Sequence, residues 1–444
     1  MINQIKNMKL SSAQILVVGY FIVIFIGTIM LMLPMATTDK ESIGFTDALF
    51  TATSATCVTG LIVVNTASAF TLFGQLVLLV LIQIGGLGLM TMSSVAALIL
   101  GRKISLKERL LIKDDLDHMK ISGLVRLVKY VLSFTLVIEG IGAFILFLRL
   151  NWDYSFWKAL YYGIFHSISA FNNAGIDIFG NSLEGFTGDI VVNFVIISLV
   201  IFGGLGFAVM VELYNEKKFK RYTLQTKMVL LFTLILILTS FVFFFFLEYS
   251  NEATLGKLPF SEKILASLFL SVTPRTAGFN TIPTGQLQSS TLFLIVILMF
   301  IGASPGSTGG GVKTTTFAVL VLTAWNLIRG KYDIEVFNRR LGKEIALKAI
   351  VIVILAFSIV ILVTMVLSIT EDKEFLAILF ETVSAFGTVG LSTGITSTLS
   401  AIGKFLIAFT MFVGRVGPLT LAVALAERQG QGVYHYPQED VMVG

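Results

Sequence analysis

The chain has 444 residues, of which 55% are hydrophobic and only 13% are charged, and its mean hydropathy is +0.89. A soluble domain carries about 25% charged residues, so this composition indicates an integral membrane protein. Three histidines and one cysteine argue against most enzyme classes, because a zinc site or a Cys/His pair needs clustered ligands. We interpret Cys57 as a small buried residue, and we expect no covalently bound cofactor.

Eight apolar runs are long enough to cross about 30 Å of hydrocarbon, which takes roughly 20 residues. They lie at about 13–33, 70–100, 123–148, 190–213, 226–247, 288–323, 346–369 and 402–426. Between the members of each successive pair lies a shorter apolar and aromatic run, at 45–56, 156–171, 261–274 and 374–386. Runs of this length are typical of re-entrant segments. The predicted fold is therefore an all-α integral membrane protein with eight spans and four re-entrant half-helices.

Each predicted unit consists of a span, a half-helix, a glycine segment and a second span. The units cover 1–114, 115–218, 219–334 and 335–428, and 429–444 forms a tail. The connections between units, near 101–129, 215–227 and 329–348, hold eight, five and six lysines and arginines. The positive-inside rule then places these connections and both termini in the cytoplasm. The basic connections either set the topology alone or also dock a cytoplasmic partner, through 331–343 and 429–444.

Each half-helix runs into a short segment that ends on glycine, and 115, 103 and 112 residues separate the four glycines. Non-helical backbone at membrane depth must be buried in protein or line water. Carbonyls of four such segments around one axis can replace the hydration shell of a cation. One Thr-Val-Gly string is weak evidence, whereas four related segments predict an ion filter. Its predicted residues are Val58, Thr59, Gly60, Asn173, Ala174, Gly175, Thr276, Ala277, Gly278, Thr388, Val389 and Gly390.

A second glycine repeat follows at 84–88, 202–206, 301–306 and 413–417. Close helix packing explains the first two copies. The third copy opens the stretch 302–311, whose proline and five glycines should break the span. The fourth holds Arg415, and a charge at membrane depth costs at least about 2.5–3.5 kcal/mol. We therefore predict a gate within 302–313 and the fourth unit, formed by Gly302, Ser304, Pro305, Gly306, Ser307, Thr308, Gly309, Gly310, Gly311, Lys313 and Arg415.

Two carboxylate interactions bear on this gate and filter. The alternative to a gating role for Arg415 is that it pairs with a carboxylate and has a structural role only. Glu381 lies near the end of the fourth half-helix, and we expect it to brace the filter, towards Arg275.

Taken together, these strings resemble the Trk/Ktr/HKT superfamily of cation transporters, in particular its Ktr-type membrane subunit. The resemblance covers essentially the whole chain. It rests on Ile-Gly-Gly-Leu-Gly at 84–88, Ser-Ala-Phe-Asn-Asn-Ala-Gly at 169–175, Thr-Pro-Arg-Thr-Ala-Gly-Phe-Asn at 273–280, Ser-Ala-Phe-Gly-Thr-Val-Gly at 384–390 and Phe-Val-Gly-Arg-Val-Gly-Pro-Leu-Thr at 412–420. It implies potassium uptake across a bacterial cell membrane through a single-chain pore with pseudo-fourfold symmetry, with K+ at the filter and the broken helix and Arg415 as the gate.

The resemblance also implies partners. These are a second copy of the chain in a homodimer, a cytoplasmic ring of nucleotide-binding RCK subunits, and membrane lipid, but no nucleic acid polymer. Sodium dependence is frequent in the family. Plant relatives with serine in place of the first filter glycine favour sodium, so Gly60 favours potassium here. Pro305 is a local variation that is expected to stiffen the loop.

Three other functions are alternatives to a potassium pore. A membrane enzyme needs converging acids, bases or metal ligands, whereas Glu139, Glu212 and Glu381 are isolated in the sequence. A secondary antiporter predicts two inverted repeats and carboxylates at the membrane midplane, whereas four repeats of one orientation are present. A less selective potassium and sodium transporter shares all the features of the potassium pore and remains the alternative.

Overall fold

The computed structural model describes residues 12–88, 91, 124–331 and 333–425. The predictions for 1–9 and 429–444, most of the connection 101–129 and the boundary at 114 lie outside these residues. The first two units contain α2 (Ser12–Met32), α3 (Phe45–Thr56), α4 (Thr66–Ala69), α5 (Leu72–Leu87), α8 (Leu124–Leu150), α9 (Phe156–Phe171), α10 (Ile190–Leu205) and α11 (Phe207–Asn215). The last two contain α12 (Leu224–Glu248), α13 (Phe260–Val272), α14 (Ser289–Phe300), α15 (Thr314–Ile328), α16 (Lys343–Thr370), α17 (Phe375–Gly387), α18 (Ala401–Val416) and α19 (Pro418–Leu425).

A short hairpin connects the third unit to the fourth. It consists of β1 (Ile334–Val336) and β2 (Arg339–Leu341), which pair antiparallel. Short 3-10 turns lie in the loops that follow three of the glycine segments, at Glu184–Phe186, Thr284–Gln286 and Thr396–Thr398. Most of the described chain is therefore helical, as the composition predicts.

Four helices are long and apolar enough to cross a membrane on their own: Ala13–Met32, Leu127–Leu150, Leu224–Glu248 and Lys343–Thr370. Each is the first helix of a predicted unit. Two bent helix pairs raise the number of candidate spans among the described residues to six. Of the other two predicted spans, 70–100 extends beyond the described residues, and 288–323 is divided by the loop between α14 and α15.

All four shorter apolar runs form helices. The first two, α3 and α9, begin and end where the sequence predicts, and α13 and α17 differ from the prediction by no more than two residues. Each of these helices ends within a few residues of its motif glycine, because the backbone there leaves the helical conformation. The glycine segments therefore begin where the half-helices stop.

The spans predicted at 190–213 and 402–426 are not continuous. The chain bends by 98° between α10 and α11 and by 94° between α18 and α19. Gly206 and Gly417 occupy these bends with φ of +95° and +93°, a conformation that glycine reaches at little cost. The prediction of continuous helices at 190–213 and 402–426 is therefore wrong, because each of these spans is bent at a glycine.

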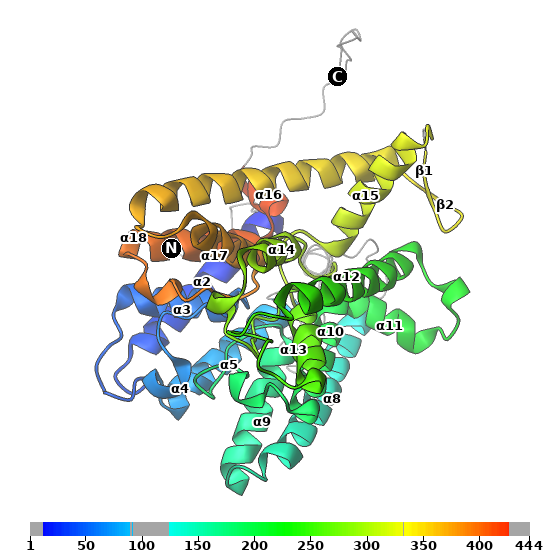
Figure 1. Cartoon of the computed structure of the whole chain (residues 1–444). Helices are drawn as coiled ribbons and strands as arrows, with labels where there is room; N and C mark the ends of the chain where they lie inside the picture. The colour runs from blue at the N-terminus through cyan, green and yellow to red at the C-terminus, as the bar shows by residue number, and fades with distance from the viewer. Residues whose placement is uncertain (1–11, 89–90, 92–123, 332, 426–444) are drawn as a thin grey trace.

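The helices pack in a closed order around the molecule. The second helix of each unit contacts the half-helix of the next: α5 packs on α9, α10 on α13, α14 on α17, and α18 returns to α3. Figure 1 shows the same progression of the chain from blue through cyan and green to orange. Each half-helix therefore contacts helices of its own unit and the second helix of a neighbouring unit.

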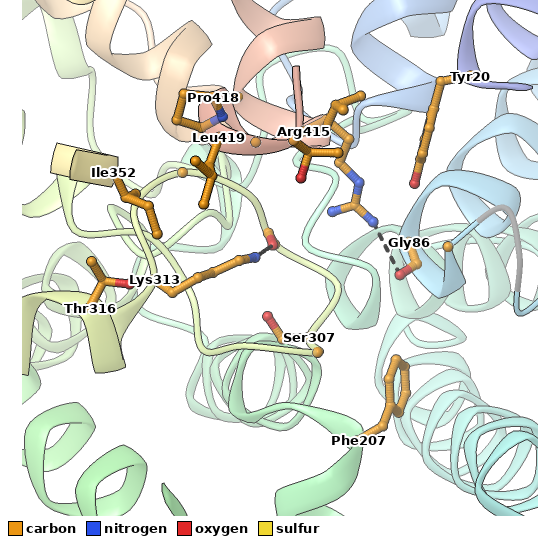
Figure 2. Close-up of a pocket in the computed structure, with 18 of the residues that line it drawn as sticks. Tyr20, Gly86, Phe207, Ser307, Lys313, Thr316, Ile352, Arg415, Pro418 and Leu419 are labelled. Carbon is orange, nitrogen blue, oxygen red and sulfur yellow. Dashed lines mark hydrogen bonds between the residues drawn. The ribbon is translucent and has the colours of Figure 1, made fainter. Parts of the chain in front are cut away.

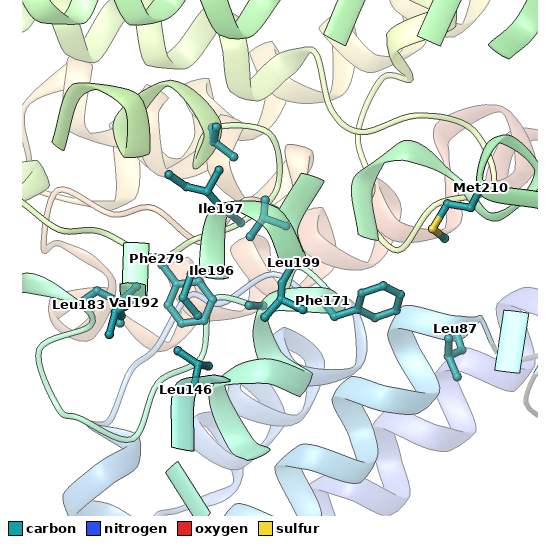
Figure 3. Close-up of a cluster of buried hydrophobic side chains, with 14 of the residues drawn as sticks. Leu87, Leu146, Phe171, Leu183, Val192, Ile196, Ile197, Leu199, Met210 and Phe279 are labelled. Carbon is teal, nitrogen blue, oxygen red and sulfur yellow. The ribbon is translucent and has the colours of Figure 1, made fainter. Parts of the chain in front are cut away.

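Apolar side chains fix the ends of the half-helices. Phe171 closes α9 and Phe279 follows the third motif glycine, and both are fully buried. They lie in one cluster with Leu87 from the end of α5 and with Ile196 and Leu199 from α10 (Figure 3). Between helices in a membrane, close van der Waals packing of such side chains, and not their removal from water, stabilises the contact. The glycine segments are thus anchored by side chains from three units.

Glycines allow the second helices to touch the half-helix ends. A Cβ atom at Gly85, Gly203 or Gly414 would overlap the carbonyl oxygen of Thr56, Phe171 or Phe386, respectively. Each of these carbonyls lies four residues before a motif glycine. The packing role that the sequence indicates for Gly85 and Gly203 is therefore present, and Gly414 of the fourth copy packs in the same way.

We expect Gly414→Ala to destabilise the protein, since overpacking of a close contact costs about 1–3 kcal/mol. Gly140→Ala is the matched control, because a Cβ atom at Gly140 in α8 meets nothing within 4 Å. Thermal unfolding in detergent should show a lower melting temperature for Gly414→Ala and no loss for Gly140→Ala. Equal melting temperatures for the two variants would contradict the packing described here.

Candidate functional site

The four glycine segments share one unusual backbone conformation. The residue two positions before each motif glycine has a positive φ, which is uncommon outside glycine and especially strained for β-branched side chains. The values are +57° at Val58, +59° at Asn173, +71° at Thr276 and +50° at Thr388. The motif glycines have φ of +96° at Gly60, +64° at Gly175, +75° at Gly278 and +90° at Gly390. Strain of this kind costs about 1–3 kcal/mol per residue and is concentrated at functional sites.

Hydroxyl groups at the ends of the half-helices hold these segments in place. They belong to Ser54, Ser169, Thr273 and Ser384, which lie five or six residues before the motif glycines. The bonds run from Gly60 N to Ser54 Oγ and from Gly390 N to Ser384 Oγ at 3.1 Å, from Ser169 Oγ to the Ile176 carbonyl at 2.7 Å, and from Thr273 Oγ1 to the Phe279 carbonyl at 2.5 Å. Each strained segment is therefore tied to its own half-helix.

The four segments meet in one closed ring. A Cβ atom at Gly60 would lie 2.5 Å from the carbonyl oxygen of Ala174, and one at Gly175 would lie 2.8 Å from that of Ala277. A Cβ atom at Gly278 would lie 2.6 Å from the carbonyl oxygen of Val389, and one at Gly390 would overlap that of Thr59. The structure thus brings together all four predicted triplets, in chain order. We call this arrangement the glycine ring.

The third unit has the predicted break in its second helix. Residues 301–313 form a loop between α14 and α15, and its backbone groups bond to other units. Ser304 N and Thr308 N donate to the carbonyls of Gly204 and Gly203 at 3.0 and 3.2 Å. Gly311 N donates to the carbonyl of Gly414 at 3.2 Å. The loop therefore bridges the second and fourth units.

The same loop lies directly against the glycine ring. Gly310 N donates to Thr388 Oγ1 at 3.0 Å. A Cβ atom at Gly309 would overlap Thr276 Oγ1. These two threonines are the strained residues of the third and fourth segments, so the loop and the ring contact each other without an intervening layer.

Arg415 joins the loop to the first unit. Its guanidinium donates to the carbonyls of Thr308 and Gly85, and to that of Gly86 at 3.3 Å (Figure 2). Among the described residues no carboxylate forms an ion pair with Arg415. Within the described part of the chain, the alternative that Arg415 is paired with a carboxylate therefore finds no partner. Backbone carbonyls stabilise the charge instead.

A cavity of about 210 Å³ adjoins the loop and Arg415. Figure 2 shows Lys313 and Arg415 facing it from opposite sides of the loop, with Tyr20 and Phe207 at its edge. Lys348 also lines it, and the lining within the described part of the chain includes no carboxylate. Lys313 donates to the carbonyl of Gly309 at 2.7 Å. A cation in this cavity would meet three positive side chains.

Glu381 does not extend towards Arg275. It is fully buried and accepts hydrogen bonds from Ser392 Oγ at 2.9 Å and from Thr396 Oγ1. It therefore fastens the loop that follows the fourth motif glycine to α17. The predicted bracing role is compatible with these bonds, but the predicted partner is wrong.

Sequence reasoning missed a polar cluster beside the second segment. Asn172 Nδ2 donates to Glu139 Oε1 at 2.9 Å and to Gln83 Oε1 at 3.1 Å. Glu139, isolated in the sequence, thus lies next to Asn173 of the ring. The available signal was a carboxylate within an apolar span, which is a functional hypothesis by default.

Asp177, two residues after the second motif glycine, was also missed. Gly180 N donates to its carboxylate at 2.7 Å. Burial nevertheless raises the pKa of the Asp177 carboxyl, and the backbone hydrogen bonds oppose that rise. Asp177 is the carboxyl group nearest in sequence to a motif glycine.

Comparisons with known proteins place the chain in a family. A family model described as TrkH, cation transport protein, matches residues 6–434. Ktr system potassium uptake protein B of Bacillus subtilis (strain 168) is 44% identical over 440 residues, which is 99% of this chain and 98% of that protein. The potassium/sodium uptake protein NtpJ of Enterococcus hirae is 38% identical over 444 residues, with 98% of each chain covered.

A solved structure of a potassium transporter has a similar fold. The crystal structure of the potassium transporter TrkH from Vibrio parahaemolyticus matches with a TM-score of 0.74 at 19% identity, covering 95% of this chain and 86% of that chain. The several apolar helices of this chain are those of a multi-pass membrane protein. This chain belongs to the TrkH family of cation transport proteins, a family of transporters and not of enzymes.

Proposed function

We propose that this protein takes up potassium through a single-chain pore whose filter is the glycine ring. The observation that carries the proposal is the ring itself, in which four segments with the same strained backbone meet around one point. In this proposal the four units are related by pseudo-fourfold symmetry, with eight spans in a bacterial cell membrane and both termini in the cytoplasm. Carbonyl groups of the ring replace the hydration shell of K+.

The named relatives give two candidate ions. The relative in Bacillus subtilis is named a potassium uptake protein, and the one in Enterococcus hirae a potassium/sodium uptake protein. Glycine is the one residue type that all four segments share, so selectivity would come from the backbone. We therefore favour potassium, with a less selective potassium and sodium pore as the second candidate.

The loop 302–313 and Arg415 would form the gate of this pore. The loop lies against Thr276 and Thr388 of the ring, and Arg415 ties it to the end of α5. A permeating cation would have to displace this loop and pass the positive side chains of the adjoining cavity. Opening would therefore require the Arg415 hydrogen bonds to break.

A cytoplasmic ring of nucleotide-binding subunits, acting on a homodimer of this chain, would control that opening. The hairpin of β1 and β2 is a candidate docking element, since Arg339 and Arg340 are exposed on it. Phe337 at its turn packs against Phe219, with ring centroids 6.2 Å apart. Lys227 Nζ lies 5.6 Å from the Phe219 ring and 5.8 Å from the Phe337 ring. These contacts support a hairpin that packs against the second connection between units, residues 215–227.

The direct test is uptake of rubidium, a potassium analogue, into proteoliposomes that contain the purified protein. We expect uptake driven by the membrane potential and competed by potassium more strongly than by sodium. Folded protein that gives no more uptake than empty liposomes would refute the proposed pore. Equal competition by the two ions would favour the second candidate.

Gly60→Ser should lower the preference for potassium over sodium several-fold. The added side chain would lie within 2.5 Å of the Ala174 carbonyl oxygen and would strain a residue with φ of +96°. Gly394→Ser is the matched control, because Gly394 has φ of +101° and nothing within 4 Å of its Cβ position. Competition of rubidium uptake by sodium measures the effect, and unchanged selectivity in Gly60→Ser would exclude this residue from the filter.

Arg415→Ala should raise rubidium uptake several-fold, because it removes the hydrogen bonds that hold the loop across the pathway. Deletion of residues 304–309 should act in the same direction. Arg415→Lys keeps the charge without the planar fork and should give an intermediate value. Arg329→Ala is the control for loss of a positive charge away from the gate, because Arg329 stacks on Trp325 instead of contacting the loop. Uptake at or below the parent level in both Arg415→Ala and the deletion would refute the gate.

A further inference from the structure

His166 is a buried polar residue next to the second segment of the glycine ring. It lies on the half-helix α9, nine positions before Gly175, and only 1% of its surface is exposed. Histidine is rare inside membrane-embedded segments, and where it occurs it is a functional hypothesis by default. Its hydrogen-bond partners therefore decide what it does there.

The two ring nitrogens of His166 bond to different parts of the second unit. Nδ1 lies 2.7 Å from the carbonyl oxygen of Tyr162, one turn earlier on α9. A carbonyl can only accept, so Nδ1 carries the proton and Nε2 accepts from Ile178 N at 3.3 Å. The imidazole also stacks on Phe179, with ring centroids 4.0 Å apart. His166 thus fastens the chain just after Gly175 to the half-helix before it.

The equivalent position of the other half-helices, nine residues before each motif glycine, holds Thr51, Phe269 and Glu381. Glu381 accepts from Ser392 Oγ at 2.9 Å, two residues after its motif glycine. Phe269 packs in an apolar cluster, and Thr51 Oγ1 donates to the carbonyl of Asp47 in its own helix at 2.7 Å. An apolar or self-bonded side chain therefore suffices for packing at this position. Of the four residues there, the histidine and the glutamate bond to the segment that leaves the ring.

These two residues belong to units that face each other across the ring. The second segment contacts the first and the third, and the fourth segment contacts the same two, so the second and fourth are opposite. A carbonyl ring selects a cation by how many carbonyls it presents and how closely they approach, and this depends on what supports the segments. We propose that His166 is a positioning residue for ion selectivity, which with Glu381 holds one diagonal of the ring. This inference rests on the proposed function of the ring as the filter.

Substitutions at His166 separate the hydrogen bond from the packing. His166→Phe keeps an aromatic ring that can stack on Phe179 but has no nitrogen, and it should make sodium compete several-fold better against rubidium uptake. His166→Gln supplies an amide oxygen that can accept from Ile178 N, and it should restore most of the parent selectivity. Thr51→Val is the matched control, because it removes the hydroxyl at the equivalent position, which bonds within its own helix.

Hydrogen exchange of the full chain in detergent, measured by mass spectrometry on peptides that cover 176–187, tests the fastening without reference to transport. We expect exchange to be several-fold faster in His166→Phe than in the parent, and unchanged in His166→Gln and Thr51→Val. If His166→Phe does not fold, His166→Met takes its place, since Met is similar in length to Gln and lacks the amide oxygen. Unchanged exchange in the folded variant would overturn the fastening.

The role in selectivity is decided by comparing the two measurements. Faster exchange in His166→Phe together with unchanged competition by sodium would overturn that role. Equal loss of selectivity in His166→Phe and His166→Gln would also overturn it, because the second variant retains an acceptor. Absence of rubidium uptake by the parent protein would refute the proposed pore, while hydrogen exchange would still decide whether His166 fastens the segment.

Discussion

Backbone polar groups at membrane depth must find partners inside the protein, because lipid offers none. Two irregular segments of this structure, the glycine ring and the loop 302–313, find such partners. At the glycine ring, hydroxyls from the half-helices accept two of the backbone N–H groups, from Gly60 and Gly390. At the loop 302–313, the carbonyls of the second and fourth units accept N–H groups of Ser304, Thr308 and Gly311. The ring segments are thus held by their own half-helices, and the loop is held by helices of other units.

The same constraint explains the environment of Arg415. The glycine-rich end of α5 exposes backbone carbonyls to the fourth unit, and the guanidinium donates to those of Gly85 and Gly86. It also donates to Thr308 of the loop. One charged side chain thus satisfies backbone groups of two units and places positive charge next to the ring. In the proposed gate, these same contacts would both stabilise the closed arrangement and oppose the passage of cations.

The ends of the four half-helices can be predicted from the sequence to within one or two residues. The length of each apolar run and the position of its motif glycine determine where the helix begins and ends. The four triplets of the ring are also recognisable, since each keeps its glycine. The bends at Gly206 and Gly417 could not be predicted, because a glycine that permits packing and one that permits a bend look alike in the sequence. The partners of Arg415 lie 107 and 330 residues away, and no local pattern identifies them.

The central claim is that the four glycine segments bind one dehydrated cation. Anomalous diffraction from crystals grown with thallium, which replaces potassium, measures this directly. The account predicts a thallium peak on the axis of the ring, surrounded by carbonyl oxygens of all four triplets. A thallium peak elsewhere in the protein, with none at the ring, would contradict it.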